Sequence, residues 1–408
     1  MIRDEYIIVG DFYLKTIEIT KEAARKYKDG FPQLSMRDFV KSEHEEDGSL
    51  IKLVSDKVFV AYAYVAKQRN SDGWILSLDE HQYINVDFYR KLFTMAQVKR
   101  TKFYYDEETN AFRFFNGSGD GIGGLNIDYF DGFYVFTFEN QGLYYHRELL
   151  YEAFSMAVSD AKGIYEKLQF NVQNDGLKRR HVQGEKASDV LEVKQNGMNF
   201  ALHLNNGDFD FNFEERDLLL GIKEKYASQK IVLSCFSKNG AVAVAAKIGG
   251  AFKTVSIDLN SKNTSKIKEN FELNNIVADK QEIRAMDITS YLDYAQKHHI
   301  MFDVIVLDPP VFVRGKKSSF SLNKDYFDLI QMALQSIKDG GTMIFTANSA
   351  TISMKRFKQI VADAFIDADY HYEVEDIYRA GEDFTVDKSF AKGNTFKSII
   401  VSVSKGRK

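Results

Sequence analysis

The chain has few cysteines, few prolines and no long hydrophobic run. Its 408 residues include one cysteine, Cys235, and three prolines, at positions 32, 309 and 310. A single cysteine excludes an internal disulfide and a cysteine-cluster metal site, and we expect no bound metal. No run of about 18 apolar residues occurs, so we expect no membrane span. The polar N-terminus lacks the basic flank and apolar stretch of a signal peptide, which predicts a cytoplasmic protein.

A basic excess is also missing. The formal net charge is −4 and the isoelectric point is about 6.1. Dedicated nucleic-acid-binding domains usually carry an excess of lysine and arginine, so any RNA contact must come from local clusters. Three segments could supply one, although solvated surface charge explains each of them equally well: residues 99–102, 178–180 and 314–317.

The sequence pattern divides the chain into three parts, because 408 residues exceed what one ordinary core organises. Residues 1–80 contain short β-rich runs, such as 58–65 and 73–78, which predict a small β-barrel or half-barrel. Residues 81–188 mix strands and helices, with a strand at 133–138, a helix at 149–158 and a polar linker at 173–188. Beyond residue 189, strands alternate with helices, which predicts an α/β fold with a doubly wound parallel sheet.

The predicted strands of the C-terminal part are residues 231–234, 254–258, 282–287, 304–308 and 342–345. The second, third and fourth of them end in a carboxylate. In doubly wound folds, ligands bind at the carboxyl edge of the sheet. Ser237 and Gly240 lie in the turn after the first of these strands, where small residues let a ligand approach the backbone. The dinucleotide signature G-x-G-x-x-G is absent from this turn, which disfavours a nicotinamide-dependent oxidoreductase.

Two of these strand-end carboxylates have the spacing of a nucleoside site. Asp258 ends the second strand about 20 residues after Gly240. An acidic residue at this spacing can accept hydrogen bonds from both ribose hydroxyls. Asp287 ends the third strand and could accept a hydrogen bond from an adenine amino group. Either residue alone is more often a solvated strand end, but the two together favour a nucleoside-containing cofactor.

The fourth strand ends in Asp308-Pro309-Pro310-Val311-Phe312. Two successive prolines fix φ near −65° and remove two N–H donors, so the loop is stiff. Asp308 and the adjacent carbonyl groups would form a polar wall, and Phe312 offers a face on which a base can stack. A purely structural turn is the alternative interpretation.

These motifs resemble those of the bacterial large-subunit rRNA cytosine-C5 methyltransferase I-type family, over essentially the whole chain. The matching segments are residues 116–128, 213–217, 232–237, 255–258 and 302–312. The resemblance implies a Rossmann-like class I methyltransferase domain at 189–408. It also implies a PUA-like β-barrel at 1–80 and a small central α+β domain at 81–188. Central-domain strands could pair across a homodimer.

The resemblance further implies S-adenosyl-L-methionine (SAM) as the cofactor and RNA, in this family rRNA, as the partner. The residues expected to contact the cofactor are Ser237, Gly240, Asp258, Asp287 and Asp308. Asp308 would also lie beside the transferred methyl group and act in catalysis together with Pro309 and Phe312.

Three departures from the family pattern bear on the chemistry. The first loop reads Phe-Ser-Lys-Asn-Gly-Ala-Val at 236–242, where the family has an aromatic and a second glycine. Asp208 and Phe209 replace a lysine and a threonine. Asn348 occupies the position of the family's nucleophilic cysteine, and Cys235 on the first strand is typical of a packing residue.

Covalent catalysis at C5 of cytosine needs a thiolate, so these departures favour another methylation chemistry. An exocyclic amine needs only positioning against the methyl group, and Asp308 and Phe312 fit that role. The alternative is a non-catalytic RNA-binding paralogue that has lost SAM binding, which the two altered loops motivate.

Overall fold

The computed structural model describes residues 7–9, 12–41, 44–68, 71–170, 178–207, 211–314, 319–390, 393 and 395–406. The chain forms two compact units. The first comprises residues 1–191, 202–210 and 382–393, and the second comprises residues 192–201, 211–381 and 394–408. No helix among the described residues is long and apolar enough to cross a membrane.

The first unit begins with a β-rich segment, as the sequence predicts. Its six-stranded sheet has the order β1-β2-β4-β5-β6-β3. The bounds are β1 (Ile7–Val9), β2 (Phe12–Glu18), α1 (Lys21–Lys28), β3 (Gln33–Leu34), η1 (Met36–Asp38), β4 (Leu50–Ser55), β5 (Val58–Val65) and β6 (Gly73–Ser77). Helix α1 begins at the cap Thr20, whose side chain accepts the Ala23 N–H. Its fully buried Tyr27 packs in the core of this sheet.

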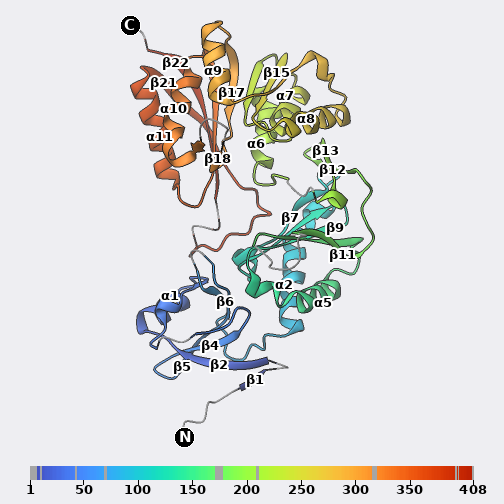
Figure 1. The fold of residues 1–408 in the computed structure, drawn as a ribbon, viewed down its shortest axis with the longest axis vertical. Helices are drawn as coiled ribbons and strands as arrows, with labels where there is room; N and C mark the ends of the chain where they lie inside the picture. Colours follow the sequence, from blue (N-terminus) through green and yellow to red (C-terminus); the bar gives the residue numbers. More distant parts are fainter. Residues whose placement is uncertain are drawn as a thin grey trace. The chain divides into compact units, whose positions relative to one another are not determined.

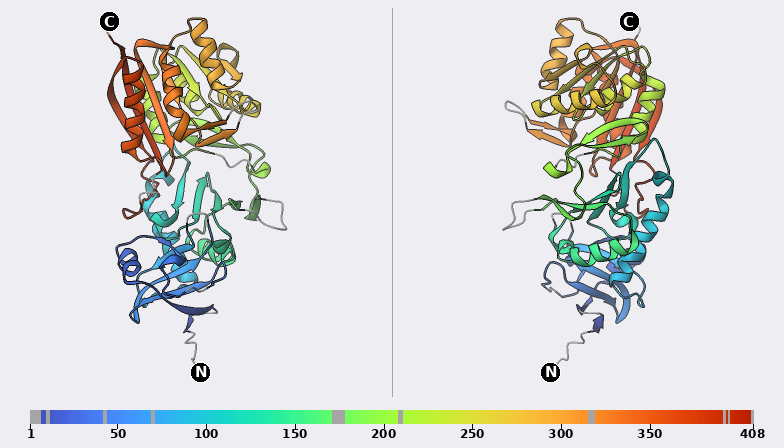
Figure 2. Two further views of the ribbon diagram at one scale, coloured as in Figure 1. Left: turned by 60° about the vertical axis from the view of Figure 1, so that its left-hand side comes forward. Right: turned by 90° about the vertical axis from the view of Figure 1, so that its right-hand side faces the viewer.

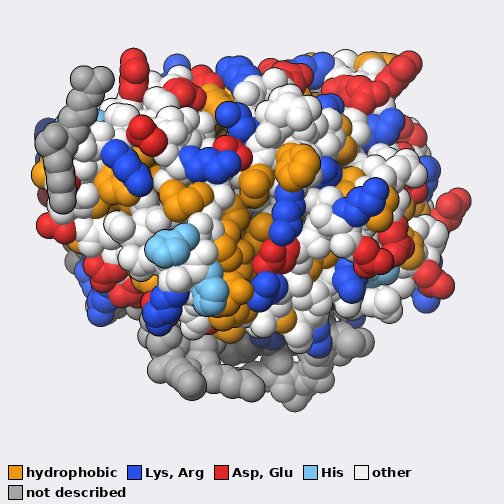
Figure 3. Space-filling model, turned by 90° about the horizontal axis from the view of Figure 1, so that it is seen from above, with side chains coloured by type: hydrophobic (Ala, Val, Ile, Leu, Met, Phe, Trp, Pro, Cys, Tyr) orange, Lys and Arg blue, Asp and Glu red, His pale blue; other side chains and the backbone are white. Residues whose placement is uncertain are grey.

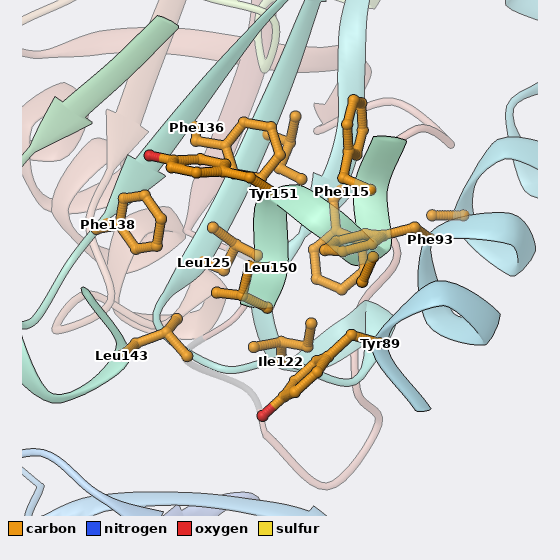
Figure 4. Packing of buried hydrophobic residues seen from close by; sticks show 14 of the residues in the cluster. Tyr89, Phe93, Phe115, Ile122, Leu125, Phe136, Phe138, Leu143, Leu150 and Tyr151 are labelled. Carbon is orange, nitrogen blue, oxygen red and sulfur yellow. The ribbon is translucent and has the colours of Figure 1, made fainter. Parts of the chain in front are cut away.

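A second sheet of the first unit, of order β11-β10-β9-β8-β7, has an aromatic core. The bounds are α2 (Val86–Lys99), α3 (Thr101–Tyr104), β7 (Ala111–Asn116), η2 (Gly117–Asp120), β8 (Leu125–Phe130), β9 (Phe133–Phe138), α4 (Gln141–Tyr144), α5 (Arg147–Ala157), β10 (Gly163–Leu168) and β11 (Arg179–Gly184). Phe93 of α2 meets Phe115 edge-on at 5.4 Å, and Tyr151 of α5 meets Phe136 at 5.2 Å (Figure 4). The strand predicted at 133–138 is confirmed, and the helix predicted at 149–158 is confirmed with slightly earlier bounds.

The prediction of a linker at 173–188 is wrong, because strand β11 lies within it and pairs antiparallel with β10. The cause is the buried carboxylate of Glu166 on β10. It accepts hydrogen bonds from Arg180 Nε at 2.6 Å and from the Tyr151 hydroxyl at 2.6 Å. A buried charge is costly without such partners, so this ion pair favours holding the polar strand at the sheet edge.

The basic cluster at 99–102 is partly structural rather than free for RNA. Arg100 is fully buried, and its Nη1 and Nη2 bond the two oxygens of Asp120 at 2.9 and 2.6 Å. Its Nη2 also donates to the carbonyl oxygen of Asp383 in the segment 382–393. Lys99 pairs with the same Asp120 at 2.8 Å. A bidentate, desolvated pair of this kind is a core interaction, so the interpretation of Arg100 as a surface phosphate contact is wrong.

The second unit contains a seven-stranded sheet of order β16-β15-β14-β17-β20-β22-β21. The bounds are β14 (Ile231–Cys235), β15 (Lys253–Asp258), β16 (Glu282–Ala285), β17 (Phe302–Leu307), β20 (Ile337–Asn348), β21 (Tyr370–Arg379) and β22 (Phe396–Lys405). The first five strands in this order are parallel, as predicted. Strand β22 breaks the predicted parallel pattern, since it runs antiparallel to both of its neighbours, β20 and β21. No crossover helix is described between β21 and β22, which permits their antiparallel pairing.

Helices lie on both sides of this sheet (Figures 1 and 2). The bounds of the remaining elements are β12 (Leu191–Gln195), β13 (Met198–Leu202), η3 (Leu204–Asn206), α6 (Arg216–Gly221), η4 (Ile222–Tyr226), α7 (Ala241–Ile248), α8 (Ser261–Leu273), η5 (Ala278–Lys280), α9 (Ile288–Lys297), β18 (Phe312–Arg314), β19 (Ser319–Ser321), α10 (Leu322–Leu334) and α11 (Met354–Asp367). Helices α9, α10 and α11 share one core with Leu233, Leu307 and Phe345 of the sheet. The unit is therefore a three-layer α/β domain of the Rossmann-like type.

The hydroxyl of buried Tyr326 in α10 bonds the carbonyl oxygens of Leu307 and Thr346, at 3.1 and 2.9 Å. We expect Tyr326→Phe to leave two buried carbonyl groups with one partner fewer and to destabilise the ends of β17 and β20 by about 1–3 kcal/mol. Native-state hydrogen exchange of amides in these strands measures the loss. Tyr372→Phe, at a half-buried position on the edge strand β21, is the control. Equal protection in both variants would show that the Tyr326 hydroxyl does not hold the strand ends.

Candidate functional site

The turn from β14 into α7 has an unusual backbone. Phe236, Lys238 and Gly240 all have positive φ, at 60°, 51° and 84°. Non-glycine residues rarely adopt this region, and such strain collects at functional sites. A Cβ on Gly240 would also come within 3.0 Å of Ile267, so the position requires glycine on two counts. The Ser237 hydroxyl bonds Ser234 O at 2.8 Å, which closes the turn from inside.

Asp258, the last residue of β15, is held by three donors. Its Oδ2 accepts from Lys238 N at 2.8 Å, and its Oδ1 accepts from Asn260 N at 2.8 Å and Asn263 Nδ2 at 2.9 Å. The first of these bonds ties the strained turn after β14 to the end of the neighbouring strand. A carboxylate has about four acceptor positions, so Asp258 retains room for one further donor.

Asp287 lies two residues beyond the end of β16 and caps helix α9. The hydrogen bonds recorded for it from described residues all end on Oδ1, from Ser290 N at 3.1 Å, Ser290 Oγ at 3.3 Å and Thr289 Oγ1 at 2.6 Å. Its side chain is half-buried. The cap thus orients the carboxylate, and none of these three bonds engages Oδ2.

Asp308 directly follows β17 and is 7% exposed. Its Oδ1 accepts a short hydrogen bond from Thr346 Oγ1 on β20. Its Oδ2 accepts from Lys238 Nζ at 2.5 Å, and the same Nζ lies 3.3 Å from Glu215 Oε1. Lys238, Asp308 and Glu215 therefore form one ion cluster, here named the Lys238 cluster.

The charges of the Lys238 cluster influence one another. Burial and the repulsion of Asp308 raise the pKa of Glu215 to about 8, against the opposing effect of Lys238. Burial by itself lowers the pKa of Lys238, but Asp308 and Glu215 raise it by more. The raised pKa favours the protonated form of Glu215, so the ammonium of Lys238 is paired chiefly with Asp308.

A cavity of about 620 Å³ lies at the carboxyl edge of β14, β15 and β16. This volume falls in the range of small-molecule and cofactor sites. Its wall includes Phe236, Lys238, Asp258, Asp287, Pro310 and Phe320. The structure thus brings Asp258 and Asp287 into one cavity, whereas Ser237 and Gly240 shape the turn and are not among the wall residues.

The loop after Asp308 places its residues in different environments. Pro309 is buried, Pro310 lines the cavity, and Phe312 is 57% exposed. Phe312 begins the hairpin β18–β19, in which it pairs with Ser321. Residues 315–317 of the basic segment 314–317 lie outside the described residues, as do Asp208 and Phe209 of the altered loop.

Cys235 and Asn348 are arranged as the sequence suggests. Cys235 is fully buried on β14, and burial raises the pKa of its thiol, so it is a packing residue. Asn348 ends β20, is exposed, and accepts a hydrogen bond from Thr395 Oγ1 at 2.5 Å. The described part of the site holds no thiol at the end of β20.

Surface charge offers no simple guide to an RNA-binding face. On the face shown in Figure 3, lysine and arginine side chains are interspersed with acidic ones. In the segment 178–180, Arg180 is paired with Glu166 and Arg179 Nη1 donates to the carbonyl oxygen of Gly207. These two arginines therefore serve the fold of the first unit as well as its surface.

Sequence reasoning missed the Lys238 cluster. Lys238 entered the sequence analysis only as a departure in the first loop, and Glu215 only as part of a matching segment. The partners Glu215, Lys238, Asp308 and Thr346 are far apart in the sequence, and only the sheet order brings them together. The one available signal was a lysine in a turn whose other residues are small or uncharged.

The strand order, the strained turn and the cavity lined by strand-end carboxylates define a class I methyltransferase domain. A family model for S-adenosylmethionine-dependent methyltransferases matches residues 125–389, and one for PUA-like domains matches residues 17–78. The chain therefore belongs to the S-adenosylmethionine-dependent methyltransferase family, and SAM is its cofactor. The expected PUA-like segment is confirmed.

Relatives and solved structures agree with this assignment. A Bacillus subtilis protein described as a candidate ribosomal RNA large subunit methyltransferase, YwbD, is 34% identical over 95% of this chain and 99% of its own length. The ribosomal RNA large subunit methyltransferase I of Shigella flexneri is 28% identical over 83% of this chain and 85% of its own. The structure of SMU.776, a candidate methyltransferase complexed with SAH, is 30% identical and aligns with a TM-score of 0.87 over 95% of this chain and 99% of its own.

The raised pKa of Glu215, about 8, predicts a pH-dependent stability. Folding favours the protonated side chain, so its contribution is fully present below the unfolded pKa near 4.5 and is lost as the pH rises through about 8. Glu215→Gln should flatten the fall in melting temperature between about pH 4.5 and 8, as measured by scanning calorimetry. Glu272→Gln, on the exposed side of α8, is the control and should follow the wild-type profile. A pH profile of the melting temperature that runs parallel in Glu215→Gln and wild type would contradict the raised pKa of Glu215.

Proposed function

We propose that the chain transfers the methyl group of SAM to an exocyclic amino group of a base in rRNA. The observation that carries the proposal is Asp308, which is buried, accepts a hydrogen bond from Lys238 of the cavity wall at 2.5 Å and directly precedes the proline-stiffened loop. The described relatives named as rRNA methyltransferases support RNA as the acceptor. The cavity and its carboxylates are assembled, which favours an enzyme over a non-catalytic RNA-binding protein.

For the cofactor, we propose the nucleoside placement that the strand ends suggest. Asp258 would accept a hydrogen bond from a ribose hydroxyl at its remaining acceptor position. Asp287 Oδ2 would accept a hydrogen bond from the adenine amino group. Phe236 and Phe320, whose ring centroids are 5.6 Å apart, add apolar wall to the same cavity. Ser237 and Gly240 would let the cofactor come close to the backbone of the turn, because their side chains are small. When bound, SAM supplies an electrophilic methyl group.

For the acceptor, we propose that Asp308 Oδ2 takes a hydrogen bond from the exocyclic amine while Phe312 stacks on the base. Pro309 and Pro310 would keep the carboxylate and the aromatic ring at a set separation. The amine nitrogen would then be aligned with the methyl carbon, and alignment can account for a large part of the rate. On gaining the methyl group as the bond from that carbon to sulfur breaks, the nitrogen would lose one N–H proton, which Asp308 Oδ2 is placed to accept. Such a reaction needs no thiol adduct, which fits Asn348 at the end of β20.

Three wider expectations stay proposals. They are the division into segments 1–80, 81–188 and 189–408, a homodimer, and a cytoplasmic location. The edge strands β7 and β11 of the central sheet are where a second copy would pair. A cytoplasmic location follows from an rRNA substrate.

Asp308→Asn tests the proposed catalytic role. The variant keeps the size of the side chain but removes the charge that would hold the amine, and we expect methyl transfer to fall about 100-fold or more. Transfer is measured with radiolabelled SAM and rRNA from a strain lacking the gene. SAM binding, measured by calorimetry, should be retained.

Two outcomes would contradict the proposal in different ways. Unchanged transfer by Asp308→Asn would remove Asp308 from the mechanism. No transfer by the wild-type chain to any RNA fraction would overturn RNA as the acceptor.

A further inference from the structure

Lys238 is the one cationic side chain among the described residues that line the cavity. The other charged groups of the wall are all carboxylates. They are Asp258, Asp287, Asp325 and Asp328. A ligand that carries its own carboxylate therefore has one side chain in this wall with which to form an ion pair.

The backbone of Lys238 is held, but the end of its side chain is not enclosed. Its N–H donates to Asp258 and its φ of 51° sets the turn. The side chain is 39% exposed, and its ammonium contacts Asp308 and Glu215 at its tip. Four methylene groups separate the tip from the anchored backbone, so Nζ can move several ångströms without any change in the turn.

The amino-acid tail of SAM carries both an ammonium and a carboxylate, next to a sulfonium. The acidic groups of the cavity match the two positive charges, but they repel the carboxylate. In the structure, the ammonium of Lys238 pairs with Asp308 Oδ2 at 2.5 Å. A bound tail would offer the ammonium of Lys238 a second carboxylate within the same cavity.

We propose that Lys238 binds the tail carboxylate of SAM by leaving Asp308, so that cofactor binding frees Asp308 Oδ2 for the acceptor amine. The inference rests on the proposed placement of SAM in this cavity, and it does not depend on which RNA is methylated. It makes Lys238 both a cofactor ligand and the group that keeps the acceptor site closed until the cofactor is present.

Two features of the cluster make this exchange inexpensive in free energy. Thr346 Oγ1 stays on Asp308 Oδ1 after Lys238 leaves, so the carboxylate keeps one strong donor. Glu215 keeps a hydrogen bond from Asn212 Nδ2 to its Oε1 at 2.9 Å, and its raised pKa, which favours the protonated form, lessens its need for a cation. What the exchange loses is the ion pair between Lys238 and Asp308. The new ion pair between Lys238 and the tail carboxylate offsets that loss.

The test compares SAM with 5′-methylthioadenosine, which has the nucleoside and the sulfur but no amino-acid tail. Calorimetry gives the affinity of each ligand for the full-length wild-type chain, for Lys238→Met and for the control Lys262→Met. Lys262 lies on the exposed side of α8, outside the cavity wall. We expect Lys238→Met to lower the affinity for SAM about ten-fold or more, and the affinity for 5′-methylthioadenosine less than about two-fold. Lys262→Met should change neither affinity.

Asp308→Asn tests the exchange rather than the contact alone. Removing the competing charge should make SAM bind more tightly than in wild type, and Lys238→Met should abolish that gain in the double variant. Lys238→Arg, which keeps the charge, should retain the preference for SAM over 5′-methylthioadenosine. It also serves as the check should Lys238→Met fold poorly by circular dichroism.

The results that overturn the inference differ from those that overturn its basis. Equal weakening of both ligands by Lys238→Met would make Lys238 a structural residue of the cavity. Tighter SAM binding by Lys238→Met would show that the lysine only obstructs the site. No SAM binding by the wild-type chain would remove the cofactor placement, and the inference with it.

Discussion

The parallel register of three strands positions the rest of the site. Cys235, the last residue of β14, pairs with Ile257 of β15 on one side and Leu307 of β17 on the other. The next residues on those two neighbours are Asp258 and Asp308, so the carboxylates flank the turn after β14. Lys238 in that turn reaches both, through its backbone N–H and its ammonium. A one-residue slip would turn these side chains to the opposite face of the sheet.

Much of this arrangement was predictable, because it follows from strand ends. Asp258 and Asp287 were predicted from their spacing at strand ends, and the Asp308 loop from its paired prolines, since parallel strands place their carboxyl ends at one edge. The family resemblance added the order of the domains. The strands at 58–65 and 133–138 are confirmed at their predicted bounds because β-branched and aromatic residues dominate both.

What could not be predicted depends on distant partners. The pairing of Glu215 with Lys238 and Asp308 is a property of tertiary packing and leaves no local pattern. For the same reason, Arg100 was taken for a surface residue, although Asp120 makes its burial possible. Strand β11 was taken for a linker because its stabilising partner, Glu166, lies on another strand. Polar sequences are ambiguous in this way, since burial of a charge is decided by the partner and not by the residue.

The central claim is that this site methylates an exocyclic amine by positioning, without a covalent thiol adduct. Mass-spectrometric mapping of rRNA from strains with and without the gene tests it most directly. The account predicts that one methyl group disappears, and that fragmentation places it on the exocyclic nitrogen of a base. Loss of a methyl group from C5 of a cytosine, or an rRNA modification map unchanged by the deletion, would contradict it.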